Sequence, residues 1–367
     1  MSQLRIIISG GGTGGHIFPA IAIADAIKAL RPDTEILFVG AEGRMEMEKV
    51  PQAGYKIIGL KIAGLQRRLT VKNLGFPFKL ISSLVKARKI VKDFKPDAAV
   101  GVGGYASGPL LRSANRLKIP TLIQEQNSYP GITNKILGKS ARKICVAYQG
   151  MEKFFAADKL ILTGNPIRKG IDEKLNQREE AIQFFGLDLK KKTVLVIGGS
   201  LGARTINDSI AGMVDSFPED GQVQMIWQTG KQGVDTAERA LSSGTSCIKA
   251  MAFIQKMDLA YAAADVIVSR AGAMSISELC LVGKPAILVP SPNVSEDHQT
   301  KNAMALVNSN AAIMVKDIKA REELKSVLFK LLDESSTQST LADNIKKLSY
   351  PLAAQQIAAE VIALVEK

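Results

Sequence analysis

Short apolar runs alternate with longer segments of helical periodicity along the whole chain. The first half holds the runs LRIIIS (4–9), EILFVG (35–40), AAVGVGG (98–104), TLIQEQ (121–126), KICVAY (143–148) and KLILTG (159–164). The second half holds TVLVIGG (193–199), VQMIWQTG (223–230), SCIKAMAF (246–253), DVIVSR (265–270), PAILVP (285–290) and AAIMV (311–315). Continuous apolar strands bounded by glycine, with helices between them, are typical of parallel sheets covered on both faces. The pattern predicts an α/β protein with doubly wound parallel sheets.

The pattern is repeated once, which indicates two domains. The segments LRIIISGGGTGGH (4–16) and TVLVIGGSLGAR (193–204) each consist of a strand, a glycine-rich turn and the start of a helical pattern. We therefore expect two Rossmann-like domains that face each other across a cleft, because ligands of open α/β sheets bind beyond the carboxyl ends of the strands. One wall of the cleft would hold a donor and the other an acceptor.

The join between the domains is expected near GNPIRKG (164–170), because Pro166 can continue neither a strand ladder nor a helix interior. The N-terminal domain would cover residues 1–165 and the C-terminal domain residues 166–350. The apolar helical pattern at 351–367 would pack back on the N-terminal domain.

Composition excludes several classes of protein. The chain has 367 residues, of which 46% are hydrophobic, as in an ordinary globular protein of about two domains. No run approaches the ~18 consecutive apolar residues of a spanning helix, and the first apolar run ends in glycines rather than at a signal-peptide cleavage site. The three cysteines and two histidines are too few and too scattered for a disulfide framework or a histidine-rich metal site. We expect neither a metal nor another cofactor.

One window carries most of the positive charge. Between Lys61 and Lys95, ten lysines or arginines stand against one acid, Asp93, so the window supplies +9 of the net charge of +13. An anionic membrane surface attracts such a cluster by about 1 kcal/mol per basic residue, and neighbouring apolar side chains dip into the interface. Nucleic acid attracts the same charges, but the phenylalanines are bunched in GFPF (75–78) beside leucines instead of forming a stacking platform.

This window predicts a peripheral contact with the cytoplasmic side of the cell membrane and no nucleic-acid partner. A buried helix with a solvated basic face is the alternative. The residues expected at the membrane are Arg67, Arg68, Lys72, Leu74, Phe76, Phe78 and Lys79.

The turn GGGTGGH (10–16) carries five glycines directly after the first strand. Gly10, Gly12 and Gly15 fit the G-x-G-x-x-G dinucleotide fingerprint, so a nicotinamide or flavin site is one alternative. Against it, the acid expected at the tip of the second strand would have to be Glu42, which stands beyond a glycine. A tight turn alone is another alternative, although it needs only one or two glycines. A P-loop is excluded because its Lys-Ser/Thr pair is missing, whereas bare backbone at a helix N-terminus suits a diphosphate.

The segment SRAGAMSISELCLVGKPAILVP (269–290) is the most specific in the second half. A helix begins near Ala273, so its N-terminus can accept phosphate while Glu278, one turn in, can accept both hydroxyls of a ribose. In SEDHQTKNA (295–303), amide side chains that both donate and accept suit sugar hydroxyls. The alternatives are that Glu278 lies on a solvated helix face and that Asp297 merely caps a helix.

Two turns of the first half, GVGGYASGP (101–109) and QEQNSYPGITNK (124–135), also follow strands. They fall where a parallel-sheet cleft opens, so we expect them to line the acceptor wall, although ordered turns would look the same. Their polar side chains are Tyr105, Ser107, Glu125, Gln126, Asn127 and Asn134.

Taken together, the motifs resemble one family over nearly the whole chain. GGTGGHIFPA, GVGGYASGP, EQN with GITNK, GNPIR, GGSLGA, SRAGAMSISE and GKPAILVPSPN with DHQTKNA occur in the order seen in the bacterial cell-wall N-acetylglucosaminyltransferases of the MurG type, in glycosyltransferase family 28. The resemblance implies the two-domain GT-B arrangement. It also implies transfer of N-acetylglucosamine (GlcNAc) from UDP-GlcNAc to the C4 hydroxyl of MurNAc in undecaprenyl-pyrophosphoryl-MurNAc-pentapeptide, which converts lipid I to lipid II in peptidoglycan biosynthesis.

The resemblance assigns roles residue by residue. Thr13, Gly14 and Gly15 would lie against the donor and acceptor diphosphates. Ile254 would read uracil through its backbone, and Ser200 would meet the UDP phosphates. The other implied substrate contacts are Asn127 on the donor-sugar side, Arg168, the run Ala273, Met274, Ser275, Ile276, Ser277 and Glu278 with Glu278 on the ribose, and Gln299 with Asn302 on the GlcNAc hydroxyls.

The sequence departs from the family pattern at two places. Gln124 stands where many members have histidine, which leaves the role of this position open. Met274-Ser275 stands where Leu-Thr is usual, and the serine keeps the hydroxyl that a phosphate contact needs.

The implied reaction needs a single in-line displacement, because the donor is α-linked and the family's product is β-linked. Helix N-termini, loop N–H groups and Arg168 would stabilise the departing UDP without a metal, and the sequence holds no D-x-D motif. An imidazole titrates near neutral pH, so His16 is the candidate general base for the attacking hydroxyl. Binding the acceptor phosphate and ordering the loop are the alternative roles of His16.

Three other functions stay open at this point. A nicotinamide oxidoreductase would use the first glycine-rich turn for NAD(P)H. A UDP-GlcNAc 2-epimerase shares the two-domain shape and the UDP chemistry, but it leaves the basic window unexplained. A non-enzymatic membrane adaptor would use that window and ignore sugar nucleotides.

Overall fold

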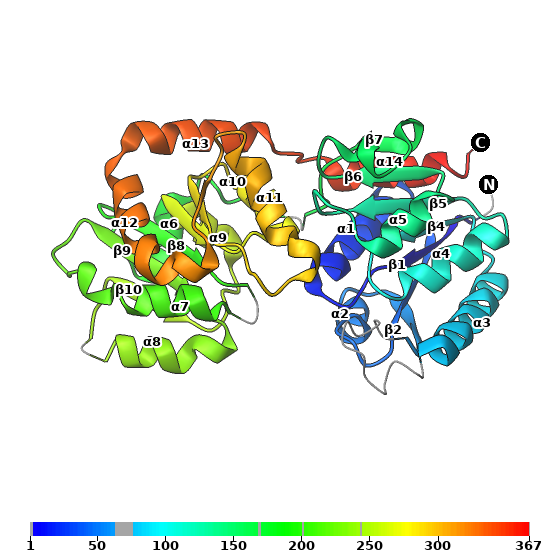
Figure 1. The fold of residues 1–367 in the computed structure, drawn as a ribbon, viewed down its shortest axis with the longest axis horizontal. Helices are drawn as coiled ribbons and strands as arrows, with labels where there is room; N and C mark the ends of the chain where they lie inside the picture. The colour runs from blue at the N-terminus through cyan, green and yellow to red at the C-terminus, as the bar shows by residue number, and fades with distance from the viewer. Residues whose placement is uncertain (1–2, 63–75, 168–169, 200–201, 243, 367) are drawn as a thin grey trace. The chain divides into compact units, whose positions relative to one another are not determined.

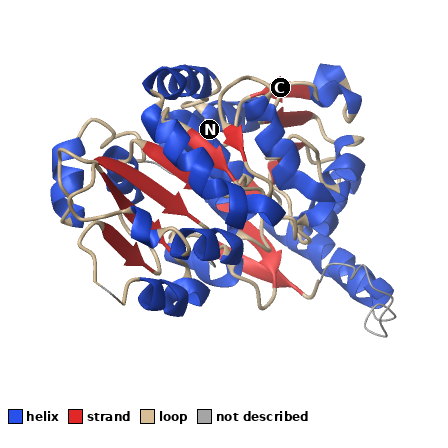
Figure 2. Cartoon of the chain, turned by 60° about the vertical axis from the view of Figure 1, so that its left-hand side comes forward, coloured by secondary structure: helices blue, strands red, loops and turns tan. Residues whose placement is uncertain are grey.

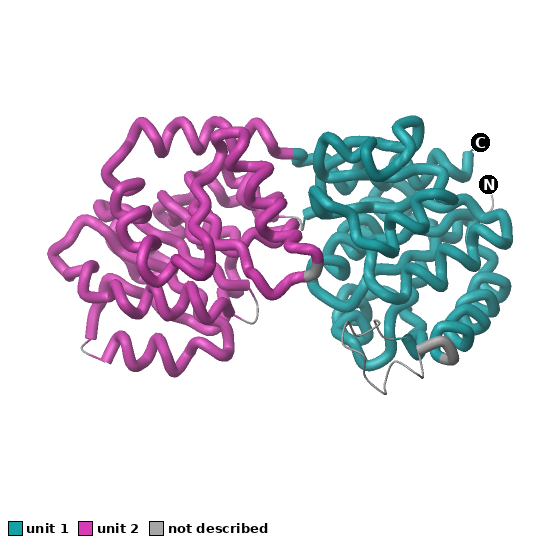
Figure 3. The backbone as a smooth tube through the Cα atoms, viewed as in Figure 1, with its two compact units in different colours: residues 1–168, 350–367 teal, residues 169–349 magenta. Residues whose placement is uncertain are grey.

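The computed structural model describes residues 3–62, 76–167, 170–199, 202–242 and 244–366, with the backbone alone at 76–78 and 295. The chain divides into two compact units (Figure 3). Unit 1 comprises residues 1–168 and 350–367, and unit 2 comprises residues 169–349. The break thus falls a few residues beyond the expected one, and the C-terminal helix belongs to unit 1.

Unit 1 is built on a parallel seven-stranded sheet of order β3-β2-β1-β4-β5-β6-β7 (Figure 1). The strands are β1 (Arg5–Ser9), β2 (Glu35–Ala41), β3 (Lys56–Leu60), β4 (Ala98–Gly101), β5 (Thr121–Glu125), β6 (Lys143–Val146) and β7 (Leu160–Leu162). In the central strand, Ile7 is in register with Leu37 of β2 and with Ala99 of β4. Ile6, Ile7 and Ile8 are fully buried, because both faces of the sheet are covered.

The strand β3 was not predicted. It pairs with β2 alone, at the edge of the sheet, and its first residues are exposed or half-buried. Its sequence KIIGL (56–60) is short and broken by Gly59, so it lacks the continuous apolar run of the central strands.

The helices of unit 1 are α1 (Gly14–Leu30), α2 (Glu46–Gln52), α3 (Phe76–Phe94), α4 (Ser107–Arg116), α5 (Ile132–Gly138) and α14 (Ala353–Ala363). Successive residues of a strand point to opposite faces. Ile8 therefore joins one apolar cluster with Ile23 of α1 and Ile357 of α14. Ile7 joins a second cluster with Val91 of α3 and Leu110 of α4.

Unit 2 has the same design, and the predicted pair of doubly wound sheets is confirmed. Its parallel six-stranded sheet has the order β10-β9-β8-β11-β12-β13, and in both units the strands lie between helices (Figure 2). The strands are β8 (Lys192–Ile197), β9 (Val223–Gln228), β10 (Ile248–Met251), β11 (Val266–Ser269), β12 (Ala286–Leu288) and β13 (Ile313–Met314). The helices are α6 (Arg178–Phe185), α7 (Arg204–Ala211), α8 (Val234–Ala240), α9 (Met257–Ala263), α10 (Ala273–Val282), α11 (His298–Val307), α12 (Ala320–Asp333) and α13 (Ser335–Lys347).

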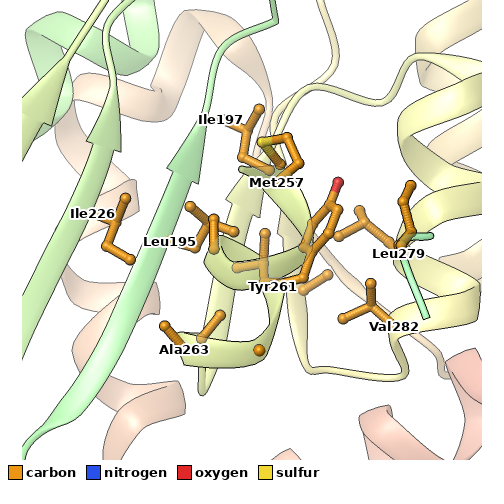
Figure 4. Packing of buried hydrophobic residues seen from close by; sticks show 14 of the residues in the cluster. Leu195, Ile197, Ile226, Met257, Tyr261, Ala263, Leu279 and Val282 are labelled. Carbon is orange, nitrogen blue, oxygen red and sulfur yellow. The ribbon is translucent and has the colours of Figure 1, made fainter. Parts of the chain in front are cut away.

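Two apolar layers enclose the sheet of unit 2. On one face, Leu195 of β8 packs in a cluster with Tyr261 of α9 and Leu279 of α10 (Figure 4). On the other face, Trp227 of β9 shares a cluster with Leu328 of α12. Each layer thus packs helices against one face of the sheet.

Each sheet has one point at which the strand order reverses. In unit 1 the chain passes from β1 to β2 on one side and later to β4 on the other, and in unit 2 the same happens at β8 with β9 and β11. Loops that leave neighbouring strands in opposite directions open a crevice there, which is where doubly wound sheets bind ligands. The two glycine-rich turns follow β1 and β8, at these two points.

We predict that α14 carries a large share of the stability of unit 1. Ile357 is fully buried against α1, so Ile357→Ala should lower the free energy of unfolding of unit 1 by about 2–5 kcal/mol. Leu352, just before the helix, is 57% exposed, and Leu352→Ala should change it by less than about 0.5 kcal/mol. Urea denaturation of both variants checks this; equal effects would contradict the packing.

Candidate functional site

A buried carboxylate holds the glycine-rich turn after β1. Glu46, at the start of α2, is fully buried and accepts hydrogen bonds from Gly12 N (2.9 Å) and Ala41 N (3.0 Å). A Cβ atom at Gly11 would overlap the Glu46 carboxylate, and a Cβ atom at Gly104 would overlap the Gly11 carbonyl oxygen. These close approaches require glycine, because any larger residue would push the turn off its two neighbours.

His16 lies in the first turn of α1, where it meets the loop after β4. Its Nδ1 is 3.2 Å from Thr13 Oγ1. Gly103 has a φ of +99°, and a Cβ atom there would stand 2.8 Å from His16 Nε2. The bare backbone of Gly103 therefore makes room for the imidazole. Thr13, Gly14, Gly15 and His16 lie together at the crevice of unit 1, beside the loop after β4.

Two of the polar side chains expected on the acceptor wall fasten the loop after β4. Ser107 is fully buried, with its Oγ 3.0 Å from Ser9 O and 2.8 Å from Gly103 O. Gln126 is also buried and donates from Nε2 to Val102 O at 2.7 Å. Tyr105, by contrast, is 48% exposed.

Glu125 organises the loop that follows β5. The carboxylate is buried and accepts hydrogen bonds from Asn127 N (3.0 Å), Asn127 Nδ2 (3.2 Å), Gly131 N (3.3 Å) and Asn134 Nδ2 (2.8 Å). Burial raises the pKa of the Glu125 carboxyl above its ordinary range, while these hydrogen bonds favour the charged form. Asn127, the predicted donor-sugar contact, is thus held by both its backbone and its side chain.

Gln124 links β5 to the segment that leads out of unit 1. Its Nε2 donates to Asn165 Oδ1 at 2.8 Å, and Asn165 Nδ2 donates to Gln126 O at 3.0 Å. All three side chains are buried. The amide at position 124, where the sequence left the role open, therefore anchors the GNP segment.

In unit 2, Gln228 connects two of the loops predicted to bind nucleotide. This buried residue ends β9, donates from Nε2 to Gly199 O (3.0 Å) and accepts from Ile254 N at Oε1 (3.4 Å). Ile254 is 1% exposed, and its backbone N–H is paired with the side chain of Gln228. Gln228 was not predicted as a site residue.

The helix α10 begins where the sequence predicted. Its N-cap is Gly272, which carries no side chain to occupy the first-turn N–H groups of Ala273 and the residues that follow. Glu278 is 8% exposed, and its Oε2 accepts a hydrogen bond from Tyr261 Oη at 2.9 Å. The alternative that Glu278 lies on a solvated helix face is therefore wrong.

Gln299 and Asn302 tie α11 to the loops after β12 and β11. Gln299 Oε1 accepts from Ser291 N at 2.8 Å, and Asn302 Nδ2 lies 3.5 Å from Ala271 O. Asn302 is fully buried, whereas Gln299 is half-buried. Asp297 has a positive φ and makes no side-chain cap, so the alternative of a simple helix cap is wrong.

Several predicted residues lie outside the described part of the chain. These are Arg67, Arg68, Lys72, Leu74, Arg168 and Ser200, together with the side chains of Phe76 and Phe78. Lys79 is described and is exposed on α3. Among the described residues, no group of three or more His, Cys, Asp or Glu is placed to hold a metal ion.

Each unit thus presents bare backbone and a helix N-terminus at its own crevice. Such groups bind phosphate oxygens, because the unpaired N–H groups point outward and the helix dipole favours negative charge. Unit 2 adds the carboxylate of Glu278, a group that can accept the hydroxyls of a ribose. Unit 1 adds the imidazole of His16, which can move a proton.

Comparisons with known proteins agree with this arrangement. The models of the glycosyltransferase family 28 N-terminal and C-terminal domains match residues 6–146 and 193–357. The UDP-N-acetylglucosamine--N-acetylmuramyl-(pentapeptide) pyrophosphoryl-undecaprenol N-acetylglucosamine transferase of Phocaeicola vulgatus is 58% identical over 100% of this chain and 97% of its own. The transferase of the same name from Parabacteroides distasonis is 55% identical over 100% of both chains. The crystal structure of Acinetobacter baumannii MurG matches with a TM-score of 0.78 and 27% identity, over 98% of this chain and 99% of that one.

We predict opposite effects for two glycines of the first turn. Gly11→Ala displaces the Glu46 carboxylate from Gly12 N, so unit 1 should lose about 1–3 kcal/mol of its free energy of unfolding. At Gly15 an added Cβ meets Thr13 Oγ1 at an ordinary 3.6 Å, so Gly15→Ala should be neutral or stabilise α1 by up to about 1 kcal/mol. Thermal melting of the two variants checks the sign of each effect; a stable Gly11→Ala protein would mean that Glu46 does not hold the turn.

Proposed function

The chain belongs to glycosyltransferase family 28, and we propose that it transfers GlcNAc from UDP-GlcNAc to N-acetylmuramyl-(pentapeptide) pyrophosphoryl-undecaprenol, as an inverting enzyme of peptidoglycan synthesis. The match to relatives of that name from end to end of the chain carries this proposal. The two crevices support it chemically, because one reactant carries a nucleoside and both reactants carry a diphosphate.

We assign the sugar nucleotide to unit 2. The backbone of Ile254 would read the uracil, and Glu278 would accept the ribose hydroxyls. The first turn of α10 would bind the diphosphate, together with Ser200. Gln299 faces the loop after β12, where it would meet the GlcNAc hydroxyls. Asn302 is fully buried, with its Nδ2 3.5 Å from Ala271 O in the loop after β11, so it would support the sugar contact rather than make it directly. The residues of this first turn and the next that we assign to the diphosphate are Ala273, Met274, Ser275, Ile276 and Ser277.

We assign the acceptor to unit 1, with Thr13, Gly14 and Gly15 at its diphosphate and Asn127 toward the sugars. In the proposed step, the C4 oxygen of MurNAc attacks the anomeric carbon of GlcNAc. The bond from that carbon to the phosphate oxygen breaks, and its electron pair leaves with UDP, which Arg168 and the α10 N-terminus would stabilise. The proton of the C4 hydroxyl passes to His16, whose ring is placed by Thr13 and Gly103.

The direct test is incubation of the full chain with labelled UDP-GlcNAc and a lipid I analogue. We expect the label on the acceptor as a disaccharide. Formation of UDP-ManNAc would instead indicate the 2-epimerase, and no reaction with either substrate would indicate the membrane adaptor. Binding of NAD(P)H, followed by fluorescence titration, would indicate the oxidoreductase.

We predict that His16→Ala and His16→Gln each lower kcat by about 100-fold or more, because the general base for the C4 hydroxyl is removed. The KM for UDP-GlcNAc should change little, since the nucleotide is assigned to unit 2. Rate–pH profiles of the two variants should lose the limb that reports the base. Near-normal turnover in both variants would place the base elsewhere.

We further propose that unit 1 contacts the anionic, cytoplasmic face of the cell membrane as a peripheral protein. On α3, Ile81 is 60% exposed and Val85 is 66% exposed, one helical turn apart. Apolar side chains flanked by basic residues suit the boundary between head groups and acyl chains. No helix within the described residues is both long and apolar enough to span a bilayer. The exposed basic residues on the same helix are Lys79, Lys86, Arg88, Lys89 and Lys92.

We predict that changing four basic residues of the window to Gln weakens binding to anionic vesicles by up to several hundred-fold, since each charge contributes about 1 kcal/mol and the four together about 4 kcal/mol. Affinity for UDP should stay unchanged. The control changes four exposed lysines of unit 2 and should leave vesicle binding intact; equal binding by both quadruple variants would refute the membrane contact. The test set is Arg67, Arg68, Lys72 and Lys79, and the control set is Lys316, Lys325, Lys330 and Lys347.

A further inference from the structure

Tyr261 is a buried polar group for which packing alone gives no reason. It is 1% exposed and lies in the apolar cluster of unit 2 beside Met257, Leu195 and Leu279 (Figure 4). Its hydroxyl donates to Glu278 Oε2 at 2.9 Å. A phenylalanine would fill the same space in this cluster without a hydroxyl to desolvate. A buried donor must be paired, so the hydrogen bond to the Glu278 carboxylate accounts for the presence of the hydroxyl.

The hydrogen bond joins two segments that are both assigned to the nucleoside. Tyr261 lies on α9, which begins at Met257, three residues after Ile254. Glu278 lies on α10, whose N-terminus is assigned to the diphosphate. The bond thus fixes the distance between the loop proposed to read the base and the carboxylate proposed to read the ribose. It also holds one carboxylate oxygen, so the rotation of the Glu278 carboxyl group is set before a ligand binds.

We propose that Tyr261 is a positioning residue that gives the site its preference for a ribonucleotide, by holding the Glu278 carboxylate in the orientation that accepts the ribose 2′ and 3′ hydroxyls. The inference rests on the proposed function, in which Glu278 meets the ribose. A pre-oriented acceptor loses no rotational freedom when the ligand arrives, so the hydroxyls contribute more to affinity than they would beside a mobile carboxylate.

The test compares the affinities of UDP and 2′,3′-dideoxy-UDP by titration calorimetry. The wild-type chain should prefer UDP. Tyr261→Phe should weaken UDP binding by about tenfold, which corresponds to about 1.4 kcal/mol and is the size of one hydrogen bond to a charged group. Binding of dideoxy-UDP should stay unchanged, because this ligand has no hydroxyls for Glu278 to accept.

Two controls isolate the hydroxyl of Tyr261. Tyr55 in unit 1 donates to Asp25 Oδ1 at 2.6 Å, so Tyr55→Phe loses the same kind of bond and should leave both affinities unchanged. Glu278→Gln should abolish the preference for UDP. In the double variant, Tyr261→Phe should then add no further loss, because Tyr261 acts through Glu278.

An equal loss of affinity for both nucleotides in Tyr261→Phe would show a merely structural role and overturn the proposal. An unchanged preference, or a second full loss in the double variant, would overturn it as well. If Glu278→Gln keeps the full preference for UDP, the ribose role of Glu278 in the proposed function fails, and that result is separate from the behaviour of Tyr261.

A second measurement keeps the hydroxyl and does not depend on a stable Tyr261→Phe protein. With 3-fluorotyrosine at position 261, the fluorine resonance should shift when UDP is added and shift much less with dideoxy-UDP. Identical responses to the two nucleotides would contradict the proposal.

Discussion

The loops at the ends of the parallel strands can bind a phosphate only if their backbone N–H groups are bare and yet held in place. In this chain, four polar side chains hold such loops in place; three of them are buried and Gln299 is half-buried. Glu46 accepts from the turn after β1, Glu125 from the loop after β5, Gln228 from the loop after β10, and Gln299 from the loop after β12. Each pairs one or more N–H groups of a loop, and so holds in place the loops at which we propose that the ligands bind.

We call the side chains of Glu46, Glu125, Gln228 and Gln299 polar clamps. Their places depend on the apolar layers against which their helices and strands pack. Placing an uncompensated carboxylate in the interior costs several kcal/mol, so Glu46 and Glu125 stay buried only because every clamp is completed by N–H donors. The helix α11, which carries Gln299, is in turn fixed by packing, because Ala303 and Leu306 lie in the apolar cluster of unit 2. A substitution in a clamp therefore acts on the loop first and on the chemistry second.

The sequence predicts the sheets and the glycine-rich turns well, because each strand and each turn is specified by a short run of contiguous residues. The edge strand β3 is missed because its run is short and only one side of it is paired. Two of the clamps cannot be read from sequence because their partners lie far apart: Glu46 is 34 residues from Gly12, and Gln228 is 26 residues from Ile254. Nothing local separates Glu46 from Glu42 and Glu48, or Tyr261 from any other core aromatic. Glu278 could be named as a ribose contact through family resemblance, but that it is buried against a tyrosine follows only from the structure.

We propose that the loops of unit 2 form the nucleotide site. A crystal structure of the chain with UDP-GlcNAc tests this proposal most directly. We expect the uridine against the backbone of Ile254, with its ribose hydroxyls within hydrogen-bonding distance of the Glu278 carboxylate. A nucleotide lying instead along Gly10–Gly15 of unit 1, as a dinucleotide would, would contradict the assignment of the nucleotide to unit 2.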